Sequence, residues 1–113
     1  MAFDSQAAIA NRLDFDKTYT TEFTADQTNA TLFSPPTGKV IAIKSIYIST
    51  LATSGFIRLI MDSDTVVTFF PTSGTSTVQV TTYKRGLVNS GLKVTSTFGD
   101  AKNYFILVNY KVE

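Results

Sequence analysis

Two closely spaced aspartates, Asp62 and Asp64 in the stretch MDSDT, could do metal chemistry. Their carboxylate oxygens are the type of ligand that calcium prefers. A calcium loop normally recruits several more oxygens than this stretch offers. Asp and Ser are also favoured in tight turns, where they hydrogen-bond to their own backbone. The sequence therefore favours a hairpin turn between strands that end at Met61 and begin at Thr65, with calcium binding as the alternative.

A second pair, Asp14 and Asp16, would share one face of an extended chain. Paired carboxylates of this kind catalyse glycoside hydrolysis in many enzymes. Nothing else in the surrounding sequence supports an active site. We interpret these residues as solvent-facing acids at the start of a strand.

The chain contains no Cys and no His. This composition excludes the usual zinc sites, thiolate nucleophiles, Ser-His dyads and imidazole acid-base catalysis. We therefore predict that the protein is not an enzyme and that it needs no cofactor and no metal.

The charge pattern argues against a strongly electrostatic partner. Charged residues make up 17% of the 113 residues, and the formal net charge is +1. The cations are scattered apart from Lys84 and Arg85, so we predict no nucleic-acid partner. No stretch approaches about 18 apolar residues, and the first residues do not resemble a signal peptide. We predict a soluble protein that is made in the cytoplasm and has no membrane partner.

From residue 15 onward the pattern is that of β-strands separated by turns. Residues 15–23 alternate apolar and polar positions. The two prolines in the SPPTG stretch at 34–38 cannot donate the backbone hydrogen bonds of a β-sheet, so this stretch is a turn. About eight strands and no convincing helix predict an all-β, antiparallel β-sandwich over residues 15–113. Eight strands favour a jelly roll over a seven-stranded immunoglobulin-like sandwich. The expected strands cover residues 15–23, 28–33, a segment within 38–50, 56–61, 65–70, 77–83, 92–98 and 103–112.

The isoleucines in GKVIAIKSIYIST do not follow a strict two-residue period. Ile41 and Ile43 are two apart, as are Ile46 and Ile48, but the step between the pairs is three. A β-bulge near Lys44 would return all four isoleucines to one face. The alternative is a regular strand that divides them between the two faces. We favour the bulge because it keeps Lys44 out of the core.

Residues 1–14 differ from the rest of the chain. They are rich in Ala, and their larger apolar residues, Phe3, Ile9 and Leu13, are isolated. The segment is too short to be a stable helix by itself. We predict an N-terminal arm, with a short helix as the alternative.

The last strand, NYFILVNYKVE, has no polar position between Tyr104 and Val108. Both faces of this strand are therefore apolar, and the chain has no helices to cover the second face. The segments FIRLIM and VVTFF repeat the pattern. Contiguous apolar surface of this kind usually marks an interface, so we predict a homo-oligomer with closed symmetry. The alternative is a single chain with a well-filled core.

Five tyrosines offer a different function, because aromatic rings on a sandwich face can stack on sugar rings. A carbohydrate-binding module is therefore the alternative function. Tyrosines are also ordinary strand residues that bury the ring and keep the hydroxyl wet. The residues concerned are Tyr19, Tyr47, Tyr83, Tyr104 and Tyr110.

The stretch Leu92 to Glu113, LKVTSTFGDAKNYFILVNYKVE, has a strand, a Gly-containing hairpin and an apolar strand that runs to the terminus. This pattern resembles the small jelly-roll, tumour-necrosis-factor-like modules that form trimers. Among these it is most similar to accessory virion proteins of tailed bacteriophages, such as capsid decoration or cement proteins.

The resemblance implies a structural protein of the virion, with the last strand near a threefold axis. A homotrimer would bind the major capsid protein or another virion protein through the arm residues Phe3, Ile9 and Leu13. The last strand would then contact sister subunits through one of two alternate sets, either Tyr104, Ile106, Val108 and Tyr110, or Phe105 and Leu107.

Overall fold

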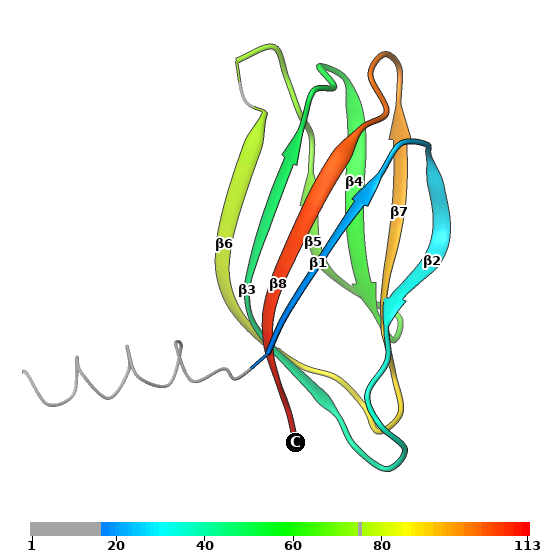
Figure 1. Ribbon diagram of the computed structural model, residues 1–113, viewed down its shortest axis with the longest axis vertical. Helices are drawn as coiled ribbons and strands as arrows, with labels where there is room; N and C mark the ends of the chain where they lie inside the picture. Colours follow the sequence, from blue (N-terminus) through cyan, green and yellow to red (C-terminus); the bar gives the residue numbers. More distant parts are fainter. Residues whose placement is uncertain (1–16, 75) are drawn as a thin grey trace, which may run out of the picture.

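The computed structural model describes residues 17–74 and 76–113 of the chain, and its ordered elements are all β-strands (Figure 1). In these residues there are eight strands, which confirms the prediction of an all-β chain of about eight strands. No helix in the described part of the chain is long and apolar enough to cross a membrane. The strands are β1 (Lys17–Phe23), β2 (Gln27–Phe33), β3 (Ile41–Thr50), β4 (Gly55–Met61), β5 (Asp64–Phe69), β6 (Thr77–Arg85), β7 (Leu92–Phe98) and β8 (Tyr104–Val112).

The strands form two four-stranded antiparallel sheets that pack face to face. One sheet has the order β1-β8-β3-β6 and the other has the order β2-β7-β4-β5. Consecutive strands alternate between the sheets, except for the β4–β5 hairpin, so most neighbours within a sheet are distant in sequence. This arrangement is that of a jelly roll, and it confirms the predicted fold class.

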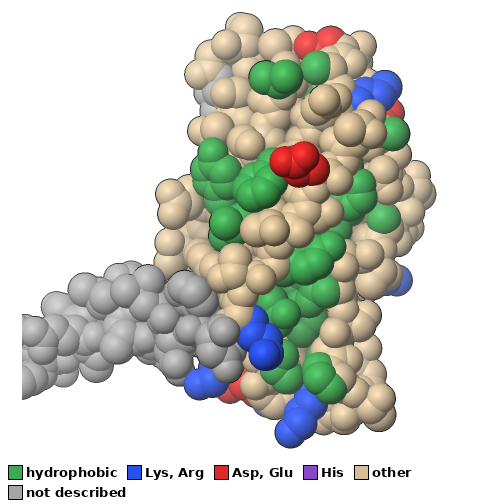
Figure 2. Space-filling model, in the orientation of Figure 1, with side chains coloured by type: hydrophobic (Ala, Val, Ile, Leu, Met, Phe, Trp, Pro, Cys, Tyr) green, Lys and Arg blue, Asp and Glu red, His purple; other side chains and the backbone are tan. Residues whose placement is uncertain are grey.

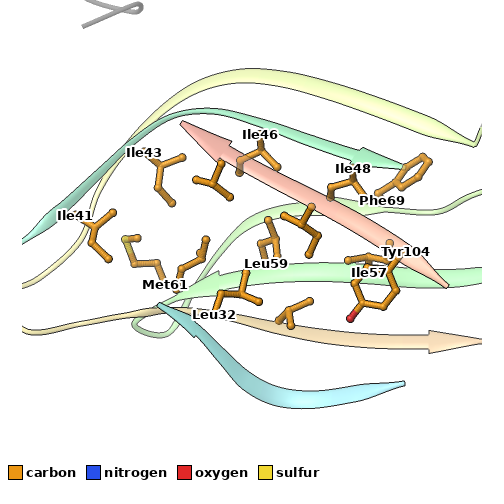
Figure 3. Packing of buried hydrophobic residues seen from close by; sticks show 14 of the residues in the cluster. Leu32, Ile41, Ile43, Ile46, Ile48, Ile57, Leu59, Met61, Phe69 and Tyr104 are labelled. Atoms are coloured by element: carbon orange, nitrogen blue, oxygen red, sulfur yellow. The ribbon is translucent and has the colours of Figure 1, made fainter. Parts of the chain in front are cut away.

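The core lies between the two sheets (Figure 3). Side chains alternate along each strand, so every second residue points into the sandwich. Ile43 and Ile48 on β3 face Ile57 and Leu59 on β4, and all four are fully buried. Burial of such side chains stabilises the fold by about 1.5 to 3 kcal/mol each. The two apolar inner faces therefore account for the stability of the sandwich.

A β-bulge interrupts β3 where the isoleucine spacing predicted it. The register shifts between Ile43 and Ser45 against both neighbouring strands, β6 and β8. Ile43 and Ile46 consequently face the core together, and the bulge is confirmed. The stated reason was wrong, because Lys44 is itself only 3% exposed. The bulge corrects the phase of the apolar residues, but it does not hold the lysine in solvent.

Candidate self-association face

The alternation of β8 determines which of its apolar residues can meet a partner. Tyr104, Ile106 and Val108 point into the sandwich and are at most 3% exposed. They belong to the core of the single chain, so they are not available to a sister subunit. Phe105 and Leu107 lie between them and point outward, where each is half-buried. Only this second set is available at the outer surface of the β1-β8-β3-β6 sheet.

Tyr110 belongs to the inward set of β8 but lies nearer the edge of the core. It is half-buried and packs against the core cluster. The centroid of its ring lies 4.5 Å from that of the Phe33 ring on β2. The Phe33 ring also contacts the ring of Tyr19 on β1, with centroids 4.8 Å apart. These aromatic contacts join the two sheets, so Tyr110 has a structural role inside the chain.

Phe105, Leu107 and Tyr47 form an apolar cluster on the outer surface of this sheet; we refer to these three residues as the outer cluster. Leu107 is directly opposite Tyr47 on β3. The rings of Tyr47 and Phe105 meet edge to face, with centroids 6.2 Å apart. Figure 2 shows hydrophobic side chains along this face, among polar atoms. The outer cluster lies at the centre of the sheet because β8 and β3 are its two inner strands.

Polar side chains next to the outer cluster are bonded to one another across the strands. The Asn109 amide on β8 donates from Nδ2 to the Ser45 hydroxyl at 2.9 Å, and its Oδ1 accepts from the Thr18 hydroxyl at 2.8 Å. This row joins β1, β8 and β3. Because these groups are paired within the chain, each would keep at least one hydrogen-bond partner if an interface buried it.

A groove of about 350 Å³ opens at the end of the same sheet. Its lining includes the outward residues Glu22 and Phe105 and the strongly exposed Leu51. The groove is therefore continuous with the outer cluster through Phe105. It combines an aromatic ring, a carboxylate and several hydroxyl groups.

Salt bridges and hydrogen bonds hold the loops near this groove. Lys102 donates to Asp26 at 2.8 Å, and this hydrogen bond lowers the pKa of the Asp26 carboxyl. The backbone and hydroxyl of Thr53 both donate to Asp100, which lowers the pKa of that carboxyl in the same way. Both acids are ionised at neutral pH and tie neighbouring loops together.

The tyrosines proposed for sugar stacking do not form one platform. Tyr19, Tyr104 and Tyr110 point inward and pack on the core. Tyr47 points outward and belongs to the outer cluster. The side chain of Tyr83 lies outside the described residues. An aromatic face made by these residues together is therefore not present among the described side chains.

Asp62 and Asp64 flank the β4–β5 hairpin turn, as the turn interpretation predicts. Asp62 accepts a hydrogen bond from the backbone N–H of Leu87 at 3.2 Å. Asp64 accepts from the Lys84 ammonium at 2.7 Å. The two carboxylates thus bind donors of the chain itself, and the described residues contain no cluster suited to a metal ion. Asp14 and Asp16 lie outside the described residues, as do Phe3, Ile9 and Leu13.

A buried hydroxyl pair joins the two sheets. The Tyr104 hydroxyl on β8 lies 2.8 Å from the Ser96 hydroxyl on β7, which also accepts from the backbone N–H of Gln27. Burial raises the pKa of Tyr104 to about 12 from the ordinary value of 10.0, and the Ser96 hydrogen bond opposes that shift. The folded state therefore prefers the neutral phenol.

This preference predicts an alkaline loss of stability. Because the folded pKa of Tyr104 is raised, its contribution is fully present below pH 10 and is lost as pH rises from 10 toward 12. At about 1.4 kcal/mol per unit, the free energy of unfolding should fall by roughly 2 to 3 kcal/mol. Urea unfolding at pH 8 and pH 11.5 measures this decrease in the free energy of unfolding. The control is Tyr104→Phe, which has no phenol to ionise at this position and should lose less stability. An equal loss in both proteins would contradict the assignment.

No protein-family model matches the sequence, and a search of curated proteins finds no match. Among solved structures, the chain is similar to a chain in the acidic stable capsid structure of Helicobacter pylori bacteriophage KHP30. The TM-score is 0.63, the sequence identity is 10%, and the similarity covers 86% of this chain and 90% of that chain. The chain shares its fold with one chain of a bacteriophage capsid. The similarity spans nearly the whole of both chains, so the two proteins are of similar length.

Proposed function

We propose that this protein is a non-enzymatic structural component of a virion, which decorates or stabilises a phage capsid or another virion part. The observation that carries the proposal is the fold similarity to a chain of a phage capsid over nearly the full length of both chains. A jelly roll by itself serves many functions. The arrangement of surface residues supports the structural role further.

Self-association through the outer cluster supports assembly on a symmetric particle. Phe105 and Leu107 are the β8 residues that point outward, and they lie on the two central strands together with Tyr47. Each apolar side chain that a partner covers fully would contribute about 1.5 to 3 kcal/mol. We propose a homotrimer in which these faces meet near the threefold axis. Closed symmetry would bury the cluster of every subunit equally.

The N-terminal arm is proposed to bind a neighbouring shell protein through Phe3, Ile9 and Leu13. The described chain begins at Lys17, which pairs with Tyr110 near the end of β8. The arm is therefore attached at one end of the sandwich, away from the groove. No nucleic acid, membrane or cofactor is part of this proposal.

Co-sedimentation with empty capsids tests the virion role. The capsids are assembled from the major capsid protein of the virus that encodes the chain. We expect the full chain to bind them. A truncation lacking residues 1–14 should bind with an affinity lower by at least about tenfold, because the contacts made by the arm are lost. The truncated chain should keep its β-type circular dichroism and its number of subunits per oligomer. Failure of the full chain to bind would contradict the proposed function, whereas unchanged binding by the truncation would contradict the arm.

A carbohydrate-binding module remains the second candidate function, and the groove is the observation that favours it. Phe105 could stack on a sugar ring while Glu22 accepts hydrogen bonds from sugar hydroxyls. A glycan array with the wild type and Phe105→Ala tests this function. Binding that Phe105→Ala abolishes, and that Phe70→Ala on the other sheet leaves intact, would favour the module.

A further inference from the structure

The loop between β6 and β7 holds two adjacent large apolar side chains in solvent. Leu87 is 67% exposed and Val88 is 58% exposed. Single exposed apolar residues are common on protein surfaces and need no explanation. Leu87 and Val88 are adjacent in sequence and both exposed, so this loop concentrates apolar surface that is suited to a contact site. We call the pair the Leu87–Val88 projection.

The backbone of this loop is fixed on both sides of the projection. Gly86 N–H donates to the Ile41 carbonyl at 2.9 Å, at the start of the loop. Asn89 N–H donates to the Lys39 carbonyl at 2.9 Å. The Asn89 side chain in turn accepts from the Gly38 N–H, at 2.6 Å. The loop is thus fastened to the segment that precedes β3.

The projecting residue itself is also anchored. Leu87 N–H donates to the Asp62 carboxylate at 3.2 Å, and the Leu87 carbonyl accepts from Ser90 N–H at 3.1 Å. The polar groups of the loop are therefore bonded inward while the two apolar side chains point out. A loop held in one conformation loses little entropy when it binds, so it suits a binding anchor.

The loop lies at the end of the sandwich where the described chain begins and ends, which we call the terminal end (Figure 1). Val40 and Glu113 exchange backbone hydrogen bonds there, and Lys17 begins β1 in the same region. The first 16 residues join the described chain at Lys17, on this end of the sandwich. Two contacts on one end reinforce each other, because binding of the first raises the effective concentration of the second.

Charge is distributed unequally between the two ends. At the terminal end Lys84 pairs with Asp64 and Arg85 pairs with Glu113. Lys39 and Lys93 are also exposed there, and among the described residues neither has a carboxylate within ion-pair distance, although the Asp62 carboxylate lines the same hollow as Lys93. Figure 2 shows Lys and Arg side chains gathered toward this end.

The opposite end carries an excess of acidic side chains. Its carboxylates are Glu22, Asp26 and Asp100, and the nearby cation Lys102 is paired with Asp26. A partner surface that is acidic would therefore be attracted by the terminal end and repelled by the opposite end. The charges orient the molecule as well as strengthen its binding.

We propose that the terminal end is the attachment surface, and that the Leu87–Val88 projection inserts into an apolar pocket on a partner protein whose surrounding surface is acidic. The identification of that partner as the capsid shell depends on the proposed function. In this arrangement Lys39 and Lys93 face the acidic surface that surrounds the partner's pocket. The outer cluster is left free for sister subunits, because it lies on the broad face of the sandwich and not on its end.

The experiment is co-sedimentation of the folded full chain with empty capsids of the same virus, in three matched forms. The double variant Leu87→Ser, Val88→Ser should bind with an affinity lower than that of the wild type by at least about tenfold, as expected for the loss of buried anchor residues. Phe70→Ser is the control, since Phe70 is 64% exposed and follows β5 at the opposite end. It should bind like the wild type. Circular dichroism confirms that each variant is folded.

A charge variant tests the acidic surround separately. Lys39→Glu, Lys93→Glu should weaken capsid binding, and wild-type binding should weaken as salt is raised from 50 to 300 mM, because exposed charges are screened. If the wild type binds while the Leu87, Val88 variant binds equally well, the inference is overturned and the proposed function stands. If the wild type does not bind at all, both are overturned.

Discussion

Replacing Ile106 by Ala is expected to lower the free energy of unfolding by about 2 to 5 kcal/mol. Ile106 is fully buried and is paired with Ile48 on β3, inside the main core cluster. Removal of its side chain leaves a cavity between two packed sheets, and the strands around it can relax only partly. The effect is measured by urea unfolding monitored by circular dichroism.

The adjacent residue provides the matched control. Leu107 has the same number of side-chain atoms but points outward, so Leu107→Ala should change the free energy of unfolding of the single chain by less than about 1 kcal/mol. The measurement is made at a protein concentration low enough for the chain to be monomeric. Comparable losses in the two variants would contradict the inward and outward assignment along β8.

Replacing Leu107 by Lys is expected to abolish self-association at micromolar concentration while the fold persists. Near a symmetry axis the substitution would bring like charges together and would remove them from water without a partner. We expect the dissociation constant to rise at least on the order of a hundredfold, since an unpaired buried charge costs several kcal/mol. Size-exclusion chromatography with light scattering measures the change in mass.

Val88→Lys is the control for this substitution. Val88 is an exposed apolar residue on the β6–β7 loop, away from the broad face of either sheet. The variant should keep the mass of the wild type. If Leu107→Lys also keeps that mass, or if both variants lose it, then the outer cluster does not form the interface.

The fold could be predicted from the sequence because local signals agree with the final structure. Turn residues such as Pro35, Pro36 and Gly38 separate segments with strand periodicity, and the absence of helix signals excludes the other layer arrangements. The step of three between Ile43 and Ile46 identified the bulge. The burial of Lys44 could not be predicted, because it depends on what neighbouring strands cover rather than on the spacing within one strand.

The site was only partly predictable. From Tyr104 to Val108 every residue is apolar, so there is no alternation of apolar and polar residues to show which side chains face the core. The inward set could therefore not be told from the outward set. Pairing with β1 and β3 resolves it, and those partners are distant in sequence. Leu87 and Val88 were not predicted as functional residues, because the residues around them are typical of turns. Two large apolar residues within a turn-like stretch could have indicated a contact site.

Self-association of the wild-type chain is tested most directly by its molar mass in solution, measured by light scattering from nanomolar to high micromolar concentration. We expect a mass near three chains at the higher concentrations, falling toward one chain, 12.4 kDa, on dilution. A mass of one chain at every concentration would contradict the proposal, and would mean that the outer cluster is ordinary solvent-exposed surface.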